Sequence, residues 1–267
     1  EKKPFFHVLP CSDCLTFGML GCDFHCGYCQ NWITSQALRD PAAGVAPTPV
    51  TAQELVDRAV ACGARAVGSS YNEPLITAEW AVDVFRRAKA AGLRTAFVSN
   101  GNATAEALDF IRPFTDCYKI DLKAMQGAAY RRLGGVLEQV LAALRMVYER
   151  GFWLEVVTLV IPGFNDDAAD LCRMADTIVA ISPAIPWHVT AYHQDYRMTD
   201  PRDTTADDLV RACEIGRAAG LHFVYAGNLP GRVGPWENTW CPGCGQLLVE
   251  RAGYRILRQQ ISAGGAC

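Results

Sequence analysis

The chain lacks any hydrophobic run that could span a membrane, and it lacks an excess of charge of either sign. Its longest apolar stretches, such as "LEVVTLV" and "VLAAL", fall far short of the roughly 20 residues that a transmembrane helix needs. Its 25 Lys and Arg residues face 28 Asp and Glu residues, a net charge of −3 that gives no reason to expect nucleic-acid binding. No secretory leader is present, and the first residue is Glu1 rather than Met, so we expect that upstream sequence was trimmed or lost. These absences predict a cytoplasmic protein with no membrane and no nucleic-acid partner.

Cysteine, in contrast, is abundant, with 12 residues among 267. Secreted disulfide scaffolds are also rich in cysteine, but they are small and loop-rich, whereas this chain has clear helix and strand patterns. Most of the cysteines form closely spaced groups, which is typical of metal or redox sites. Single cysteines inside apolar helix or strand patterns are expected to be buried and inert: Cys62, Cys117, Cys172 and Cys213.

Strand-like and helix-like segments alternate along the chain. The predicted strands cover residues 15–20, 64–70, 94–100, 116–122, 152–161, 187–193 and 221–227. The predicted helices cover residues 51–63, 76–91, 103–111, 136–150, 167–180 and 206–219, the first capped by Thr51 and the second closed by Gly92. This alternation indicates at least six parallel βαβ units.

Polar or glycine-rich sequence follows every one of these strands, as in "SSYNEP", "SNGN" and "DLKAM". In a parallel barrel the strand ends all meet on one face, where catalysis takes place. We therefore predict an α/β fold, a partial (β/α)6 TIM-like barrel over residues 1–234, rather than a flat doubly wound sheet. Residues 235–267 are predicted to form a small C-terminal extension, a cysteine knuckle followed by a hairpin.

The stretch "GCDFHCGYC" places Cys22, Cys26 and Cys29 within eight positions at the end of the first predicted strand. A cubane 4Fe–4S cluster normally takes four thiolates, so three leave one iron open to a small ligand. A structural zinc would need a fourth ligand, and His25 lies between two of the cysteines. The spacing favours the open cluster, with zinc or a disulfide as the alternatives.

The same stretch resembles the signature of radical S-adenosylmethionine (radical SAM) enzymes, in which an aromatic residue, here Tyr28, precedes the last cysteine. The chain is similar in particular to the AmmeMemoRadiSam branch, which is itself similar to glycyl-radical activases such as pyruvate formate-lyase activating enzyme. The resemblance covers nearly the whole chain and is carried, in order, by "EKKPFFHVLP", "CQNWITSQ", "YNEP", "VSNG", "IDLKAM", "TLVIPGFND", "PWHVTAYHQDYRM", "GNLPG" and "NTWCPGCGQLLVERAGY".

This resemblance implies a 4Fe–4S cluster on the three cysteines, with the amino and carboxylate groups of SAM on its open iron. One electron, from a donor such as flavodoxin or ferredoxin, would cleave SAM to methionine and a 5′-deoxyadenosyl radical. The radical would abstract hydrogen from a small molecule or a protein side chain that the sequence does not identify. Two other functions remain open: a glycyl-radical activase acting on a partner protein, and a non-catalytic iron–sulfur or zinc protein.

The resemblance also implies SAM contacts at the ends of the second and third strands. Glu73, with Asn72 before it, stands where related enzymes carry a Gly-Gly-Glu-Pro stretch, and its carboxylate is expected to accept hydrogen bonds from the SAM ammonium. A structural role, as a helix N-terminal Glu before Pro74, is the alternative. Ser99 and Asn100 match positions that meet the ribose or the methionine carboxylate.

Further SAM contacts are implied along the later strands. Asp121 and Lys123 match an Asp-Leu-Lys motif, and strand alternation sends both to one side, where they suit a zwitterionic ligand; a structural ion pair is the alternative. Ile161 lies in a segment that resembles the one under adenine. His188 matches a His near the adenosyl group, although a core histidine is the alternative. The rim residues that could touch substrate are His193, Asp195, Tyr196 and Arg197.

Four cysteines remain, in two CxxC pairs. Cys241 and Cys244 form a "CPGC" knuckle, and Cys11 and Cys14 have the same spacing just before the first strand. We predict that the four thiolates bind one second centre, zinc or another iron–sulfur cluster. Two separate reduced pairs, or a redox disulfide within one pair, are the alternatives.

Overall fold

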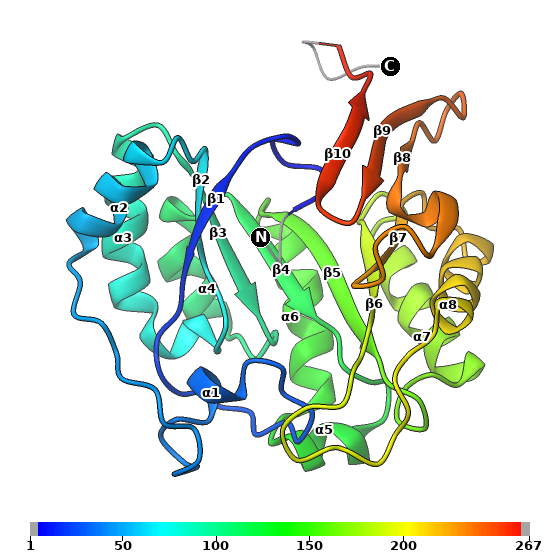
Figure 1. Cartoon of the computed structure of the whole chain (residues 1–267), viewed down its shortest axis with the longest axis horizontal. Helices are drawn as coiled ribbons and strands as arrows, with labels where there is room; N and C mark the ends of the chain where they lie inside the picture. Colours follow the sequence, from blue (N-terminus) through cyan, green and yellow to red (C-terminus); the bar gives the residue numbers. More distant parts are fainter. Residues whose placement is uncertain (1–4, 263–267) are drawn as a thin grey trace.

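The computed structural model describes residues 5–262. Its main feature is a seven-stranded parallel sheet in which each strand pairs with the next one along the chain. β1 and β7 form the two edges, so the sheet is an open, partial barrel (Figure 1). The predicted α/β barrel is therefore confirmed. The strands are β1 (Cys14–Phe17), β2 (Ala66–Ser69), β3 (Arg94–Ser99), β4 (Cys117–Asp121), β5 (Trp153–Val160), β6 (Trp187–Ala191) and β7 (Val224–Gly227).

The helices that connect the strands lie on the outer side of the sheet (Figure 1). Thr51 caps α2 through a capping box with Glu54, and Gly92 follows α3 with a φ of +77°, so both predicted helix ends are confirmed. No helix within residues 5–262 is both long and apolar enough to cross a bilayer. The helices are α1 (Trp32–Ser35), α2 (Ala52–Ala61), η1 (Pro74–Thr77), α3 (Ala78–Ala90), α4 (Ala105–Ile111), η2 (Arg112–Phe114), α5 (Gly127–Leu133), α6 (Leu137–Glu149), α7 (Ala168–Val179), α8 (Ala206–Ala218) and η3 (Gly234–Glu237).

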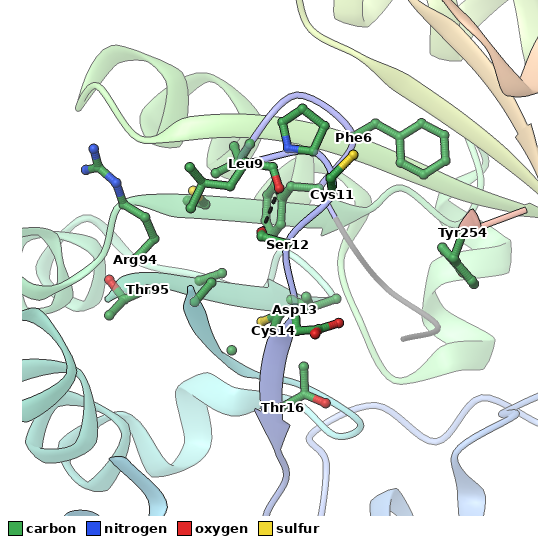
Figure 2. A pocket seen from close by; sticks show the side chains of 18 of the residues that line it. Phe6, Leu9, Cys11, Ser12, Asp13, Cys14, Thr16, Arg94, Thr95 and Tyr254 are labelled. Atoms are coloured by element: carbon green, nitrogen blue, oxygen red, sulfur yellow. Dashed lines mark hydrogen bonds between the residues drawn. The ribbon is translucent and has the colours of Figure 1, made fainter. Parts of the chain in front are cut away.

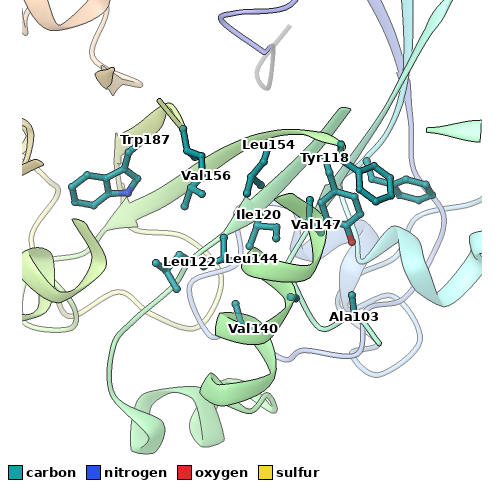
Figure 3. Close-up of a cluster of buried hydrophobic side chains, with 14 of the residues drawn as sticks. Ala103, Tyr118, Ile120, Leu122, Val140, Leu144, Val147, Leu154, Val156 and Trp187 are labelled. Carbon is teal, nitrogen blue, oxygen red and sulfur yellow. The ribbon is translucent and has the colours of Figure 1, made fainter. Parts of the chain in front are cut away.

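Alternation along the strands separates an apolar outer face from a polar inner face. In β4, Tyr118 and Ile120 are fully buried and pack with α6 side chains such as Leu144 (Figure 3). Burying each such side chain contributes about 1.5–3 kcal/mol of hydrophobic free energy. The residues that alternate with them, Lys119 and Asp121, therefore face the inside of the barrel.

The structure differs from the sequence prediction at several short elements, and two of the differences concern β1 and α5. β1 ends at Phe17 rather than at residue 20, and the chain passes close to β2 at the next residue, Gly18, where a Cβ would lie only 2.7 Å from the carbonyl oxygen of Ser70. The sequence prediction also missed α5, which has seven residues, no side-chain cap and Gly127 at its start. Both differences lie at the carboxyl end of the barrel, next to the candidate site.

The C-terminal extension is a three-stranded antiparallel sheet of β8 (Thr239–Trp240), β9 (Leu247–Ala252) and β10 (Arg255–Gln259). The sequence predicted its hairpin but not β8. Arg251 of this sheet donates hydrogen bonds to Thr239 Oγ1 at 2.6 Å and to the Phe6 carbonyl at 3.2 Å. The buried Arg251 thereby fastens the extension to the segment that enters the barrel before β1.

The four single cysteines do not share one environment. Cys117 and Cys213 are buried, as predicted, and burial raises the pKa of the Cys117 thiol to about 12. Cys62 and Cys172 are exposed, so the prediction of burial was wrong for them. Cys62 is the C-cap residue of α2 and Cys172 lies on the solvent side of α7, where the apolar pattern of the helix does not extend.

Candidate functional site

The three cysteines of the predicted cluster motif lie on the loop that follows β1. Cys26 is buried, and Cys22 and Cys29 are half-buried. The Cys29 N–H donates to the Cys26 carbonyl at 3.2 Å, and the Trp32 N–H donates to the Cys29 carbonyl at the same distance, so the loop turns directly into α1. Three potential metal ligands are therefore presented by one short, internally hydrogen-bonded segment.

The loop rests on a glycine pair that the sequence prediction missed. A Cβ on Gly134, where φ is +86°, would lie 2.5 Å from the His25 ring, and a Cβ on Gly135 would overlap the Phe24 ring. The His25 N–H also donates to the Leu133 carbonyl at 2.9 Å. The two aromatic residues between the first and second cysteines can approach α5 so closely only because these positions carry no side chain.

We expect Gly135→Ala to lower the iron content of the reconstituted protein. Gly135 has no positive φ, so the effect comes from overlap with Phe24, and overpacking of this kind costs about 1–3 kcal/mol. Iron per chain and the thermal midpoint are the measurements. Gly44→Ala is the matched control, because nothing lies within 4 Å of its Cβ position and its φ is not positive. Wild-type iron content in Gly135→Ala would show that the loop does not depend on this contact.

A cavity of about 940 Å3 lies at the carboxyl ends of the strands, beside the cysteine loop. Cys26 and Cys29 form part of its wall. The motif aromatic Tyr28 lines it too, and of the eight residues with implied SAM contacts those that line it are Asp121, Lys123 and His188. The cavity is large enough for a drug-sized ligand, because such sites measure about 300–1,000 Å3.

Asp121 and Lys123 face the cavity as an ion pair, with 3.3 Å between Lys123 Nζ and Asp121 Oδ2. Leu122, between them, is fully buried and belongs to the hydrophobic cluster drawn in Figure 3, as the predicted alternation requires. Burial alone would lower the pKa of Lys123, but Asp121 and the Cys26 thiol hold it well above its usual value. A fixed cation and an anion therefore stand together next to the cysteine loop.

Glu73 lies beneath the end of β3 and does not line the cavity. Its Oε1 accepts hydrogen bonds from Leu75 N–H at 3.0 Å and Ser99 Oγ at 2.9 Å, and its Oε2 accepts one from Asn100 N–H at 2.7 Å. Burial raises the pKa of this carboxyl to about 8. Glu73 is thus the N-cap of η1, with Pro74 in the first turn, as the structural alternative predicted. Its contact with SAM stays a prediction.

The neighbouring candidates in this region also make internal hydrogen bonds. Asn72 Oδ1 accepts from Met19 N–H at 3.1 Å, and Asn100 Nδ2 donates to Asp23 Oδ1 at 2.7 Å. Asn72 and Asn100 thereby connect the ends of β2 and β3 to the cysteine loop. Ile161, predicted to lie under adenine, is fully buried and does not line the cavity. Its backbone N–H donates to Asn165 Oδ1 at 2.7 Å.

His188 lines the cavity, and its ring is held by a buried carboxylate that the sequence prediction missed. Its Nε2 lies 2.6 Å from Glu155 Oε2, and Lys119 Nζ lies 3.8 Å from the same oxygen. Burial, followed by the charge of Lys119, lowers the pKa of His188 to about 4, so at neutral pH the ring is uncharged and donates Nε2–H to Glu155. Glu155 also accepts hydrogen bonds from the backbone N–H groups of Phe6 and His7 at 3.2 and 3.1 Å. A polar residue inside the apolar run "LEVVTLV" was the signal for Glu155.

We expect this buried His188 to make the protein less stable in mild acid. Its pKa of about 4 lies below the usual 6.5, so the unfolded chain binds the proton more tightly and stability is lost as pH falls from 6.5 toward 4. Between pH 7 and pH 5 the loss from this group is about 2 kcal/mol. Urea unfolding at both pH values measures it, and His188→Gln, which can still donate to Glu155, should remove it. A loss of stability between pH 7 and pH 5 that is as large in His188→Gln as in the wild type would contradict the assignment of this loss to His188.

The rim residues after β6 cross over the cysteine loop. The Arg197 N–H donates to the Gly27 carbonyl at 3.0 Å, and Trp32 Nε1 donates to Asp195 Oδ1 at 3.1 Å. The rings of Trp32 and Tyr196 stack with centroids 5.1 Å apart. Asp195 and the exposed His193 line the cavity, so this segment both covers the loop and borders the space for a substrate.

The predicted second metal site receives no support from the structure. The Cys11 thiol donates to Gln259 Oε1 of β10 at 3.1 Å, and with Cys14 it borders a separate cavity of about 360 Å3 (Figure 2). Cys241 follows β8, which is separated from β10 by β9. Neighbouring strands are about 4.8 Å apart, whereas all thiolates of a zinc site lie about 2.3 Å from the ion. The structure therefore gives no support to a centre shared by the two CxxC pairs, which stays a prediction.

No group of three or more His, Cys, Asp and Glu side chains stands in ligand geometry within residues 5–262, the three loop cysteines included. The chemistry of the donor set and of its surroundings is therefore what indicates the cluster. Burial raises the pKa of Cys22 to about 12 and that of Cys26 to about 11, while the charge of Lys123 opposes both shifts. Iron binding must displace these protons, and Lys123 stabilises the thiolates that result. The three thiols fit an iron–sulfur cluster, and the adjoining Asp121–Lys123 pair fits a zwitterion.

Comparison with known proteins agrees with this donor set. The family model described as the radical SAM superfamily matches residues 17–175. Uncharacterized protein MJ0808 of Methanocaldococcus jannaschii is 32% identical over 252 residues, which cover 94% of this chain and 74% of that protein. Pyruvate formate-lyase 1-activating enzyme of Escherichia coli is 26% identical over 165 residues, which cover 58% of this chain and 64% of that enzyme.

Solved structures share the fold. A radical SAM methyltransferase from Sphaerobacter thermophilus superposes with a TM-score of 0.58 at 18% identity, over 88% of this chain and 69% of that chain. A domain of pyruvate-formate lyase-activating enzyme from Bacteroides vulgatus superposes with a TM-score of 0.55 at 22% identity, over 61% of this chain and 99% of that domain. At these identities the likeness concerns the partial barrel alone.

Proposed function

The chain belongs to the radical SAM superfamily, and on this basis we propose that it cleaves SAM reductively and uses the radical to remove a hydrogen atom from a substrate. When bound, a 4Fe–4S cluster with an open iron supplies the electron that splits the SAM sulfonium into methionine and a 5′-deoxyadenosyl radical. Cys22, Cys26 and Cys29 would hold the cluster. The observation that carries the proposal is the Asp121–Lys123 pair facing the same cavity as Cys26.

The residues around that cavity have three tasks in this function. Lys123 Nζ would bind the carboxylate of SAM, and Asp121 would accept hydrogen bonds from the ribose hydroxyls or the ammonium. Tyr28, buried beside Cys26 with its ring 5.5 Å from that of Phe164, would hold the loop against the barrel. The neutral His188, fixed by Glu155, would present an uncharged edge to the adenosyl group. The rim segment after β6, which contains Tyr196 and crosses over the cysteine loop, would help to exclude water from the cavity.

Similarity to known proteins does not identify the substrate. Similarity to activating enzymes of glycyl-radical enzymes supports a second candidate, hydrogen abstraction from a glycine of a partner protein. That similarity covers 58% of this chain for the E. coli enzyme, and the chain spans less than two thirds of that relative. We therefore propose hydrogen abstraction in general, from a small molecule or a protein, with a flavodoxin or ferredoxin as electron donor.

Isotope transfer tests the proposal directly. The reconstituted, reduced protein would be incubated with SAM and an extract of cells grown on deuterated nutrients, and 5′-deoxyadenosine analysed by mass spectrometry. Deuterium in the 5′ position shows that the radical attacks an extract component, and fractionation then shows whether that component is small or a protein. Release of 5′-deoxyadenosine without deuterium, at the rate seen in buffer alone, would contradict the proposed hydrogen abstraction.

A further inference from the structure

Large apolar side chains are exposed beside the cysteine loop. Leu38 is 72% exposed and Ile33 is 49% exposed, and they lie after and within the short helix α1. Both Leu38 and Ile76 come within 4 Å of the Cβ position of Gly21, so they lie together over the start of the loop, one residue before Cys22. Ile76 is itself 44% exposed. Exposed apolar residues gathered at one place are typical of an interaction site.

Positive charge adjoins the same loop. Arg39 Nη1 donates to the Phe24 carbonyl at 3.1 Å. On the other side, the His25 N–H donates to the Leu133 carbonyl at the end of α5. In Figure 1, α1 and α5 lie at the same end of the molecule. Three exposed arginines therefore stand close to the residues between the first two cysteines: Arg39, Arg131 and Arg132.

These arginines are not neutralised by the chain itself. No carboxylate within residues 5–262 forms an ion pair with any of them. The acidic residues nearest to this patch in the sequence have other partners. Asp23, on the loop, accepts hydrogen bonds from two asparagine side chains, and Asp40, next to Arg39, accepts them from Tyr196 and Arg197. The chain carries a net charge of −3, so this positive patch runs against its overall charge.

The position of the patch indicates what it binds. Cys26 and Cys29 line the cavity that SAM and substrate would fill, so an electron must reach the cluster from the solvent side of the loop. We propose that this side, the donor face, docks an acidic one-electron carrier protein of the flavodoxin or ferredoxin class. The donor face consists of Ile33, Leu38, Arg39, Ile76, Arg131 and Arg132.

The inference rests on the proposed function and adds a partner surface to it. One electron passes from the reduced carrier to the cluster, the carrier is oxidised by one electron, and no bond is made or broken in this step. The apolar residues would form the dry centre of the contact, and the arginines would steer an acidic partner, which makes association fall with salt. Electrostatic steering changes association rates by about 10- to 1,000-fold.

Charge reversal tests the donor face. 5′-Deoxyadenosine formation would be measured with limiting reduced flavodoxin and, separately, with dithionite. The double variant Arg131→Glu/Arg132→Glu should lower the flavodoxin-supported rate about tenfold or more and leave the dithionite-supported rate unchanged. The matched control is Arg86→Glu/Arg87→Glu, because these are also adjacent, exposed arginines, on the outer helix α3. Leu38→Asp, on the other side of the loop, should act like the first double variant.

The outcomes separate the two proposals. Equal flavodoxin-supported rates for both double variants and for Leu38→Asp would overturn the donor face while leaving SAM cleavage intact. A wild-type protein that forms no 5′-deoxyadenosine with dithionite would overturn the proposed function, and the donor face with it. Loss of the wild-type salt dependence only in Arg131→Glu/Arg132→Glu would support the steering role of these arginines.

Discussion

Replacing any one of Cys22, Cys26 and Cys29 with Ala abolishes the cluster and all SAM cleavage. Two thiolates cannot hold a cubane cluster against loss of iron, and no further cysteine lies on the loop to replace the third. Iron and sulfide per chain, the visible absorbance of the cluster and 5′-deoxyadenosine after reduction are the measurements. We expect all of them to fall to background in each single variant.

The exposed cysteines provide the control for this prediction. Cys62→Ala and Cys172→Ala remove thiols that lie on α2 and α7, outside the loop, and should leave iron content and SAM cleavage unchanged. A variant of Cys26 that retained a full cluster and released 5′-deoxyadenosine would show that the ligands have been assigned to the wrong cysteines.

Lys123→Met weakens SAM binding about 10- to 150-fold, because a hydrogen bond to a charged group contributes about 1.5–3 kcal/mol. The change keeps the length of the side chain and removes the charge that faces the cavity. Asp121 is partly exposed and can be solvated when its partner is lost, so the fold should persist. The dissociation constant would be measured anaerobically on the reconstituted protein, with iron content checked in parallel.

A surface lysine controls for the loss of one positive charge. Lys89→Met breaks the ion pair with Asp116 on the outer side of the barrel and should leave SAM affinity unchanged. If Lys123→Met bound SAM as tightly as Lys89→Met does, the Asp121–Lys123 pair would be structural, as the alternative reading of the sequence allowed.

The barrel could be predicted from the sequence because its strands and helices carry strong local signals. Alternation in "CYKIDLK" placed Asp121 and Lys123 on one face, and the structure confirms this because Ile120 and Leu122 pack on the opposite side. Thr51 and Gly92 marked helix ends through side-chain capping and a positive φ, which depend on a few neighbouring residues. Such local signals can be recognised in the sequence without any knowledge of contacts between distant residues.

Contacts between distant segments were beyond prediction. Gly134 and Gly135 carry no signal in the sequence, because their contact with Phe24 and His25 exists only once α5 lies beside the cysteine loop. Glu155 read as part of an apolar strand, because its partners come from other strands and from the segment before β1.

The contacts of the polar residues that were predicted to hold SAM could not be predicted from the sequence either. Glu73, Ser99 and Asn100 do come together, as motif positions at the ends of adjacent strands should. The Glu73 carboxylate accepts hydrogen bonds from the Ser99 hydroxyl and the Asn100 backbone N–H, and none of the three residues lines the cavity. The sequence could not distinguish this internal bonding from ligand binding. The equal spacing of the two CxxC pairs likewise suggested a shared centre that the structure does not support.

The most direct test of the account is SAM cleavage by the reconstituted protein itself. The protein would be loaded with iron and sulfide without oxygen, reduced with dithionite in the presence of SAM, and assayed for methionine and 5′-deoxyadenosine. We predict that the two products form in equal amounts, only after reduction, and that the Cys22/Cys26/Cys29 triple-Ala variant forms neither. A wild-type protein that carries a full cluster and binds SAM, yet yields no 5′-deoxyadenosine on reduction, would contradict the account.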